Sequence, residues 1–228
     1  MTIQRLQMEI KNNRPSRTGI IFFGQILASA THEIKNNLAI INENAGLMED
    51  LSMMAQKGSP LSPERVATTA QRIIAQVKRA DQVLRRMNQF SHSVDIPEEL
   101  VDLEKTVLFV RELGSRLIEM KGARIDITPP QSPVLVSTNL FFLEHLIWEA
   151  IETCLETDMG KKQIDISFKD VDQHPSIRFT MEGMKKKSLP RIESPENREL
   201  MAELNIIVEK DTVDNGFGLI WQNPDQKV

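Results

Sequence analysis

The sequence is poor in the residues that build disulfide scaffolds and metal clusters. Cys154 is the only cysteine in 228 residues, so neither an internal disulfide nor a multi-cysteine metal site can form within one chain. This cysteine falls in an apolar helical pattern, which predicts a buried structural thiol. His92, His145 and His174 lack Cys, Asp and Glu neighbours at ligand spacing, so we expect no metal site.

Long apolar runs and an excess of basic charge are also lacking. Residues 19–30 are interrupted by Gln25, and no run approaches the roughly 20 residues needed to cross a bilayer. Residues 1–18 have no hydrophobic core followed by a cleavage site, so they do not resemble a secretory signal. The chain carries 28 basic and 32 acidic residues, a formal charge of −4, which argues against nucleic-acid binding. We therefore expect a cytoplasmic protein with neither a membrane nor a nucleic acid as partner.

Two long amphipathic helices dominate the first part of the chain. The first is predicted from about Arg17 to Gln56, before the stop signal Lys57-Gly58-Ser59-Pro60. Ser62 and Pro63 open the second as cap and first helical residue. Apolar residues recur at steps of three and four in both helices, and we expect them to form buried seams. The seam residues are Phe23, Leu27, Ala30, Ile34, Ile41, Ala45 and Met48, with Asn37 and Leu38 between them, and then Val66, Ala70, Ile73, Val77, Ala80, Leu84, Met87 and Ser91.

A single helical hairpin cannot cover both of these seams and its own flanks. The economical solution is a homodimer in which two hairpins form a four-helix bundle. His32 lies about 200° around the first helix from Ile34, so its imidazole should point away from the seam. Asn36 follows one turn later on the same face. An ordinary imidazole is partly neutral near pH 7, so His32 is a candidate nucleophile or base, although a tolerated surface histidine fits the spacing alone.

Residues 95–99, with Pro97, break the helical pattern and mark a domain boundary. The predicted organisation is an arm over residues 1–18, a helical hairpin over 19–96 and a second domain over 97–228. The second domain should be an α+β sandwich with helices on one face of a mixed sheet. Its predicted helices run from 103 to about 121, over 140–155 and over 195–204. Its predicted strands cover 123–128, 134–137, 163–169, 176–180, 206–210 and 217–222.

The segment Thr31–Leu38, THEIKNNL, resembles the H-box of sensor histidine kinases. The resemblance extends over residues 20–224, through a second bundle helix to a domain shaped like the ATP-binding domain of that family. It implies a dimeric four-helix bundle for dimerisation and histidine phosphotransfer, followed by an ATPase-like α/β sandwich. Asn37 departs from the pattern of the family, because many members have a proline there that kinks the helix. With asparagine at this position, we expect a straighter helix.

The nucleotide-binding motifs of that family do not carry over to this sequence. Aligning residues 140–156 with the family's N-box helix puts Glu149 where an asparagine would hold metal and phosphates. The expected aspartate-glycine-x-glycine turn is replaced by Met181-Glu182-Gly183-Met184, with one glycine. Gly216-Phe217-Gly218-Leu219 comes too late in the chain, and we assign it to a turn before the last strand. A phosphate cradle needs glycines and a magnesium ligand, so we do not expect ATP as a cofactor, and the ATP-binding-like domain is interpreted as degenerate.

This combination resembles the histidine phosphotransferases of sporulation and cell-cycle phosphorelays. The resemblance implies that His32 accepts a phosphoryl group from one receiver-domain aspartate and passes it to another. Glu33 would accept a hydrogen bond from the other ring nitrogen, and the response-regulator receiver would supply Mg²⁺, so the chain needs no cofactor of its own.

Two alternatives remain open at this point. One is a response-regulator phosphatase or degenerate kinase, in which the amide of Asn36 orients water against an aspartyl phosphate. The other is a dimeric signalling adaptor without catalysis.

Overall fold

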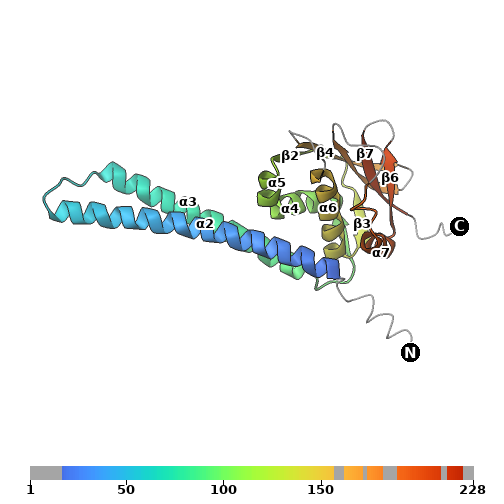
Figure 1. Cartoon of the computed structure of the whole chain (residues 1–228), viewed down its shortest axis with the longest axis horizontal. Coiled ribbons are helices and arrows are strands. Elements are labelled where there is room, and N and C mark those ends of the chain that lie inside the picture. Colours follow the sequence, from blue (N-terminus) through green and yellow to red (C-terminus); the bar gives the residue numbers. More distant parts are fainter. Residues whose placement is uncertain (1–16, 157–161, 172–173, 182–188, 212–214, 223–228) are drawn as a thin grey trace, which may run out of the picture. The chain divides into compact units, whose positions relative to one another are not determined.

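The computed structural model describes residues 17–156, 162–171, 174–181, 189–211 and 215–222 (Figure 1). Their contacts group them into two compact units. One unit, residues 25–91, is a helical hairpin, and the other contains all the strands together with residues 17–24. None of the helices in the described ranges combines the length and the apolar character needed to cross a bilayer. The predicted arm over residues 1–18 lies almost wholly outside the described residues.

The hairpin consists of α2 (Arg17–Gln56) and α3 (Pro63–His92), with the bounds that the sequence predicts. α2 ends where the chain turns at Gly58, whose φ of 89° suits a residue without a side chain. The Ser62 hydroxyl accepts a hydrogen bond from the Arg65 amide at the start of α3. α2 is helical across Asn37, as expected for a sequence without proline at that position.

The residues that pack inside the hairpin differ from the predicted seams. Buried positions recur every seven residues on each helix, and we call them the inner column: Ala30, Asn37, Asn44 and Leu51 on α2, and Thr69, Gln76, Val83 and Phe90 on α3. Leu38, Val77 and Leu84, all expected to be buried, are instead 54%, 52% and 55% exposed. We expected a second copy to cover the seams, so their exposure in one chain does not contradict the prediction. Within the hairpin, Asn37, Asn44, Thr69 and Gln76 occupy the middle of the contact between α2 and α3. Leu38, Val77 and Leu84 lie beside that contact, and no residue of the hairpin buries them.

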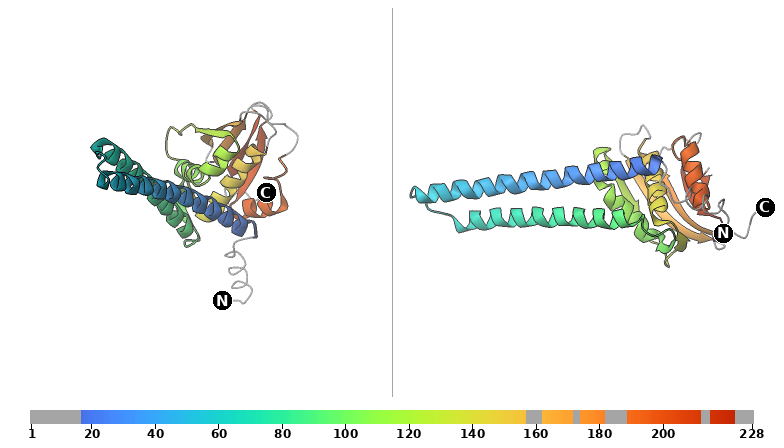
Figure 2. Two further views of the ribbon diagram at one scale, coloured as in Figure 1. Left: turned by 60° about the vertical axis from the view of Figure 1, so that its left-hand side comes forward. Right: turned by 90° about the horizontal axis from the view of Figure 1, so that it is seen from below.

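The second unit is an α+β sandwich, which confirms the predicted fold class. Its elements are β1 (Glu99–Asp102), α4 (Leu103–Leu113), α5 (Ser115–Met120), β2 (Ala123–Ile127), β3 (Leu135–Thr138), α6 (Leu140–Leu155), β4 (Lys162–Val171), β5 (His174–Met181), α7 (Pro195–Glu203), β6 (Ile206–Asp211) and β7 (Gly216–Trp221). Five strands form a mixed sheet in the order β2-β4-β5-β7-β6, with only β2 and β4 parallel, and β1 pairs with β3 in a small separate ribbon. Figure 2 shows the curvature of the larger sheet.

The helices of this unit cover one face of the five-stranded sheet. α6 contacts β5, α4 and α7, and α7 also contacts β6. Alternate residues of the strands, such as Ile164, Ile166, Phe179 and Phe217, are fully buried beneath these helices. Phe179 and Phe217 stack with ring centroids 5.3 Å apart. α6 is buried nearly all round, which makes it the central element of the core.

Local sequence explains several element boundaries that the pattern alone did not give. The helix predicted from 103 to about 121 is divided at Gly114, where a Cβ atom would overlap the ring of Trp148. β1 was not predicted, because four residues beside a proline carry little periodicity. Gly216-Phe217-Gly218-Leu219 forms the start of β7 rather than the turn that we assigned, and Gly216 lies against the backbone of Phe179.

Cys154 is buried, as predicted, and burial raises the pKa of its thiol to about 12.

Candidate functional site

His32 and Asn36 lie in the middle of α2 with exposed side chains. His32 is two residues after Ala30 of the inner column, a rotation of about 200°, so it points away from α3. Asn36 directly precedes Asn37 of the same column and lies to one side of it. The exposure of His32 and Asn36 agrees with the geometry expected from the sequence. An exposed imidazole on a continuous helix is accessible to a partner and is held by a rigid element.

Glu33 is positioned differently from the other two predicted residues. Its carboxylate is about one-third exposed and lies 3.7 Å from the guanidinium of Arg86 on α3. Neighbouring residues of a helix diverge by about 100°, so Glu33 faces α3 while His32 faces away from it. The hairpin therefore places a carboxylate and a guanidinium next to the predicted nucleophile. Sequence reasoning missed Arg86, because its proximity to Glu33 depends on the register between the two helices.

The buried amides of the inner column leave hydrogen-bonding atoms without partners. Asn44 donates from Nδ2 to the Ile40 carbonyl oxygen over 2.7 Å. Asn37 Nδ2 and Gln76 Oε1 are buried and have no hydrogen-bond partner among the described residues. Such atoms weaken a helix contact, since each costs about 1–3 kcal/mol of desolvation. The α2–α3 contact is therefore polar and only partly satisfied beside the predicted nucleophile.

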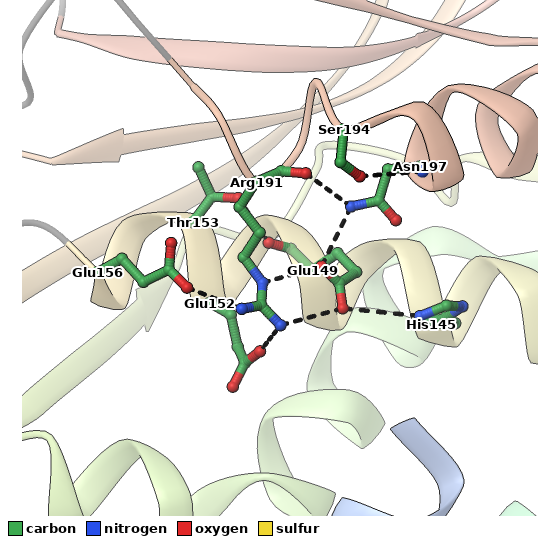
Figure 3. Close-up of polar contacts among 8 residues, drawn as sticks. All are labelled: His145, Glu149, Glu152, Thr153, Glu156, Arg191, Ser194 and Asn197. Carbon is green, nitrogen blue, oxygen red and sulfur yellow. Dashed lines mark hydrogen bonds and ion pairs between the residues drawn. The ribbon is translucent and has the colours of Figure 1, made fainter. Parts of the chain in front are cut away.

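A second polar cluster surrounds Glu149 on α6, the position aligned with a nucleotide-binding asparagine (Figure 3). Arg191, from the segment before α7, donates from Nε to Glu149 Oε2 over 2.9 Å and from Nη1 to Glu156 Oε1 over 2.7 Å. The same guanidinium pairs with Glu152. Asn197, in the first turn of α7, donates from Nδ2 to Glu149 Oε2 over 3.1 Å and to the Arg191 carbonyl oxygen over 2.9 Å. The carboxylate of Glu149 is thus fully engaged by groups of its own chain.

The charge of this cluster follows from its contacts. Burial alone raises the pKa of Glu149, but His145, Asn197 and Arg191 outweigh this effect and bring the pKa down to about 2. Burial raises the pKa of Glu152 more than the nearby Arg191 lowers it. Glu149 is therefore a stable anion with Arg191 as its counterion. Sequence reasoning identified Glu149 but not Arg191 and Asn197, which follow it by 42 and 48 residues.

The segment proposed to replace the glycine turn is described only at its first residue. Met181 ends β5 and is buried, while residues 182–184 lie outside the described residues. Among the residues that the structure does describe, no three His, Cys, Asp or Glu side chains converge to hold a metal ion. The described chemistry is thus an exposed histidine with an amide one turn away, and an internally paired carboxylate on α6.

No protein-family model matches the sequence, and none of the curated proteins does. Among solved structures, the chain is similar to the histidine kinase AdeS of Acinetobacter baumannii, with 13% identity, 84% of this chain and 97% of that chain covered, and a TM-score of 0.46. It is also similar to a structure described as a bacterial phosphotransferase, with 9% identity, 88% and 95% covered, and a TM-score of 0.44. The cytoplasmic segment of the histidine kinase QseC gives 11% identity, 64% and 95% covered, and a TM-score of 0.42. TM-scores below 0.5 describe a partial similarity of fold and say nothing about activity.

Proposed function

We propose that this chain is a histidine phosphotransferase of a two-component phosphorelay, which passes a phosphoryl group between receiver-domain aspartates through His32. The observation that carries the proposal is the exposure of His32 at the centre of a 40-residue helix, with exposed Asn36 one turn later. The matching H-box residues supply the reaction class. A rigid helix holds the imidazole where a partner can bring its phosphate in line.

The proposed step needs little covalent machinery. A lone pair on a neutral ring nitrogen of His32 attacks the phosphorus of an aspartyl phosphate, the phosphorus–oxygen bond to the carboxyl group breaks, and the aspartate leaves as a carboxylate. The carboxylate of a second receiver then attacks the phosphohistidine and releases the imidazole. We propose Glu33 as the acceptor of a hydrogen bond from the other ring nitrogen. Because its carboxylate lies 3.7 Å from Arg86, this role requires Glu33 to leave that contact. Mg²⁺ would come with the receiver.

We further propose that the second unit does not use ATP. A triphosphate brings several negative charges, and the α6 face that would receive it presents Glu149, Glu152 and Glu156. The guanidinium of Arg191 already contacts all three carboxylates, so the site is filled from within the chain. These residues do not fit a nucleotide–magnesium complex. A titration with Mg²⁺-ATP followed by calorimetry tests this, and tight binding would restore a kinase function.

The exposed apolar side chains of the hairpin support a homodimer. Leu38 on α2 and Val77 and Leu84 on α3 each follow an inner-column residue by one position, and all three are more than half exposed. Ile34 and Ile41 flank them. We call these five residues the apolar face. A second copy would cover this surface in a four-helix bundle and leave His32 accessible on both chains.

Phosphotransfer is tested with receiver domains carrying labelled aspartyl phosphate. We expect acid-labile label to appear on the full-length chain and to be absent from His32→Ala. Asn36→Ala should still accept label, because the amide does not form the new bond. Mass spectrometry that finds the phosphoryl group on another residue, or no label with any receiver of the same genome, would contradict the proposal.

A second candidate function is hydrolysis of the receiver's aspartyl phosphate. The exposure of Asn36 favours it, because an amide at that position can orient water. In this case, phosphate release would survive His32→Ala and be lost in Asn36→Ala. A purely adaptor function would leave receiver binding and signalling unchanged in both variants.

A further inference from the structure

Four arginines recur at seven-residue intervals along α3. Arg65, Arg72, Arg79 and Arg86 form what we call the arginine column, and the last three each follow a buried residue of the inner column by three positions. Three residues correspond to a rotation of about 300°, so these side chains share one side of the helix contact. Seven residues advance by about 10 Å, so the charges form an extended line.

The contact between Arg86 and Glu33 identifies the face of the hairpin on which this column lies. Glu33 also follows an inner-column residue by three positions, and its carboxylate meets the Arg86 guanidinium at 3.7 Å. The arginine side of α3 therefore adjoins the Glu33 side of α2. Asn36, which precedes Asn37 by one residue, projects to this same side, and His32 leans toward it. The apolar face lies on the opposite side.

The positive charge of the column is largely available to a partner. Arg65, Arg72 and Arg79 are exposed, and none of them forms an ion pair with another described residue. Arg72 lines a groove between the helices together with Asn44, Gln76, Glu43 and Asp50. Arg86 contributes only a loose contact to Glu33. On a chain with a formal charge of −4, these guanidinium groups form a positive line on α3, beside the carboxylates of Glu43 and Asp50 on α2.

We propose that the arginine column is a docking surface for the acidic face of a receiver domain, an inference that rests on the proposed phosphotransfer. A donor that brings an aspartyl phosphate to His32 presents negative charge, while this chain is itself net negative. A positive line on the side of Asn36 offsets that repulsion and orients the approach. Arginine is suited to the task, because its planar fork binds carboxylates in a bidentate manner. The column selects and orients the donor and forms no bond in the reaction.

The test compares two double charge reversals on α3 in the full-length protein. Arg72→Glu with Arg79→Glu reverses the column, and Lys78→Glu with Arg85→Glu makes the same charge change at two residues also seven apart, turned about 100° around the helix. The rate of label transfer to His32 is measured at about 50 mM and 300 mM salt. We expect the column variant to be slower by about tenfold or more at low salt, and less so at high salt. The control should change by less than about twofold, since its charges lie away from the proposed docking face.

Each outcome distinguishes between the two proposals. If wild-type His32 accepts no label from any receiver, the proposed function fails and the docking surface fails with it. If the wild type is labelled and both double variants are labelled equally fast, only the docking surface is wrong. Circular dichroism verifies that both variants remain helical. A nucleic-acid surface is assigned instead if the column variant loses binding to a 30-base-pair duplex while receiver transfer is unchanged.

Discussion

Glu144 is a carboxyl group that the fold buries almost completely on α6. Its side chain is 1% exposed, and Oε2 has no hydrogen-bond partner among the described residues. Burial raises its pKa to about 8, a hydrogen bond with Ser93 opposes the rise, and the carboxylate of Glu99 adds to it. The neighbouring His145 stacks on Phe22 at 5.1 Å. Two adjacent residues of α6 thus contact other segments: Glu144 contacts Ser93, which follows α3, and His145 contacts Phe22, near the start of α2.

The raised pKa of Glu144 predicts a loss of stability as pH increases. The unfolded chain releases this proton near pH 4.5 and the folded chain near pH 8, so the contribution is fully present below pH 4.5 and is lost as pH rises to about 8. Glu144→Gln should remove this dependence and be more stable than wild type at pH 8 by a few kcal/mol, on the order of the linkage expected for such a shift. Urea unfolding followed by tryptophan fluorescence at pH 5 and pH 8 measures the difference in stability. Glu112→Gln, at an exposed position of α4, is the control, and an equal effect there would contradict the assignment.

Arg191 holds the segment before α7 against α6 through three carboxylates. Replacement by methionine leaves the largely buried Glu149 without its counterion, and we expect a loss of about 3 kcal/mol in the free energy of unfolding. Arg85→Met, which removes an exposed pair with Asp81, should have little effect. Chemical denaturation of both variants at pH 7 decides this, and equal losses would show that Arg191 has no special role.

Among the elements, the junction of α4 and α5 depends on a single glycine. A Cβ at Gly114 would overlap the ring of the fully buried Trp148. Gly114→Ala should therefore destabilise the second unit by about 1–3 kcal/mol through overpacking. Gly24→Ala, in α2 with no atom near the added Cβ, is the control and should not destabilise its helix. Thermal unfolding of both variants measures the difference, and equal melting temperatures for Gly114→Ala and wild type would refute the overpacking.

The end of α2 and the start of α3 were predictable, because Gly58, Ser62 and Pro63 act on residues close to them in the chain. The packing of these two helices was not predictable from hydrophobicity, since Asn37 and Gln76 occupy buried positions. The site divides in the same way. The exposure of His32 follows from helical geometry within one element, whereas Arg86 and Arg191 reach their partners through tertiary register. Rotation within a helix is encoded locally, but contacts between distant segments are not.

At the scale of the whole molecule, association through the apolar face is open to a direct test. Leu84 is 55% exposed in the single chain, so a charge there disturbs no contact within the hairpin but should disfavour a second copy. We expect Leu84→Glu to convert a dimer to a monomer in multi-angle light scattering. Gln82→Glu, an exposed position of α3 on the arginine side, should remain dimeric. A monomeric wild type, or a dimeric Leu84→Glu, would contradict the four-helix bundle.

The polar inner column has a consequence for how the protein responds to dilution. In the middle of their contact, the two helices meet through Asn37, Asn44, Thr69 and Gln76, which remove little apolar surface from water. Two of these side chains keep polar atoms with no hydrogen-bond partner among the described residues. In the proposed homodimer, contacts with the partner copy then supply much of the free energy that keeps residues 25–91 helical. Folding and association of the hairpin are coupled in that homodimer, so we expect its melting temperature to rise with protein concentration. The strand-containing unit has its own core and melts at a temperature independent of concentration.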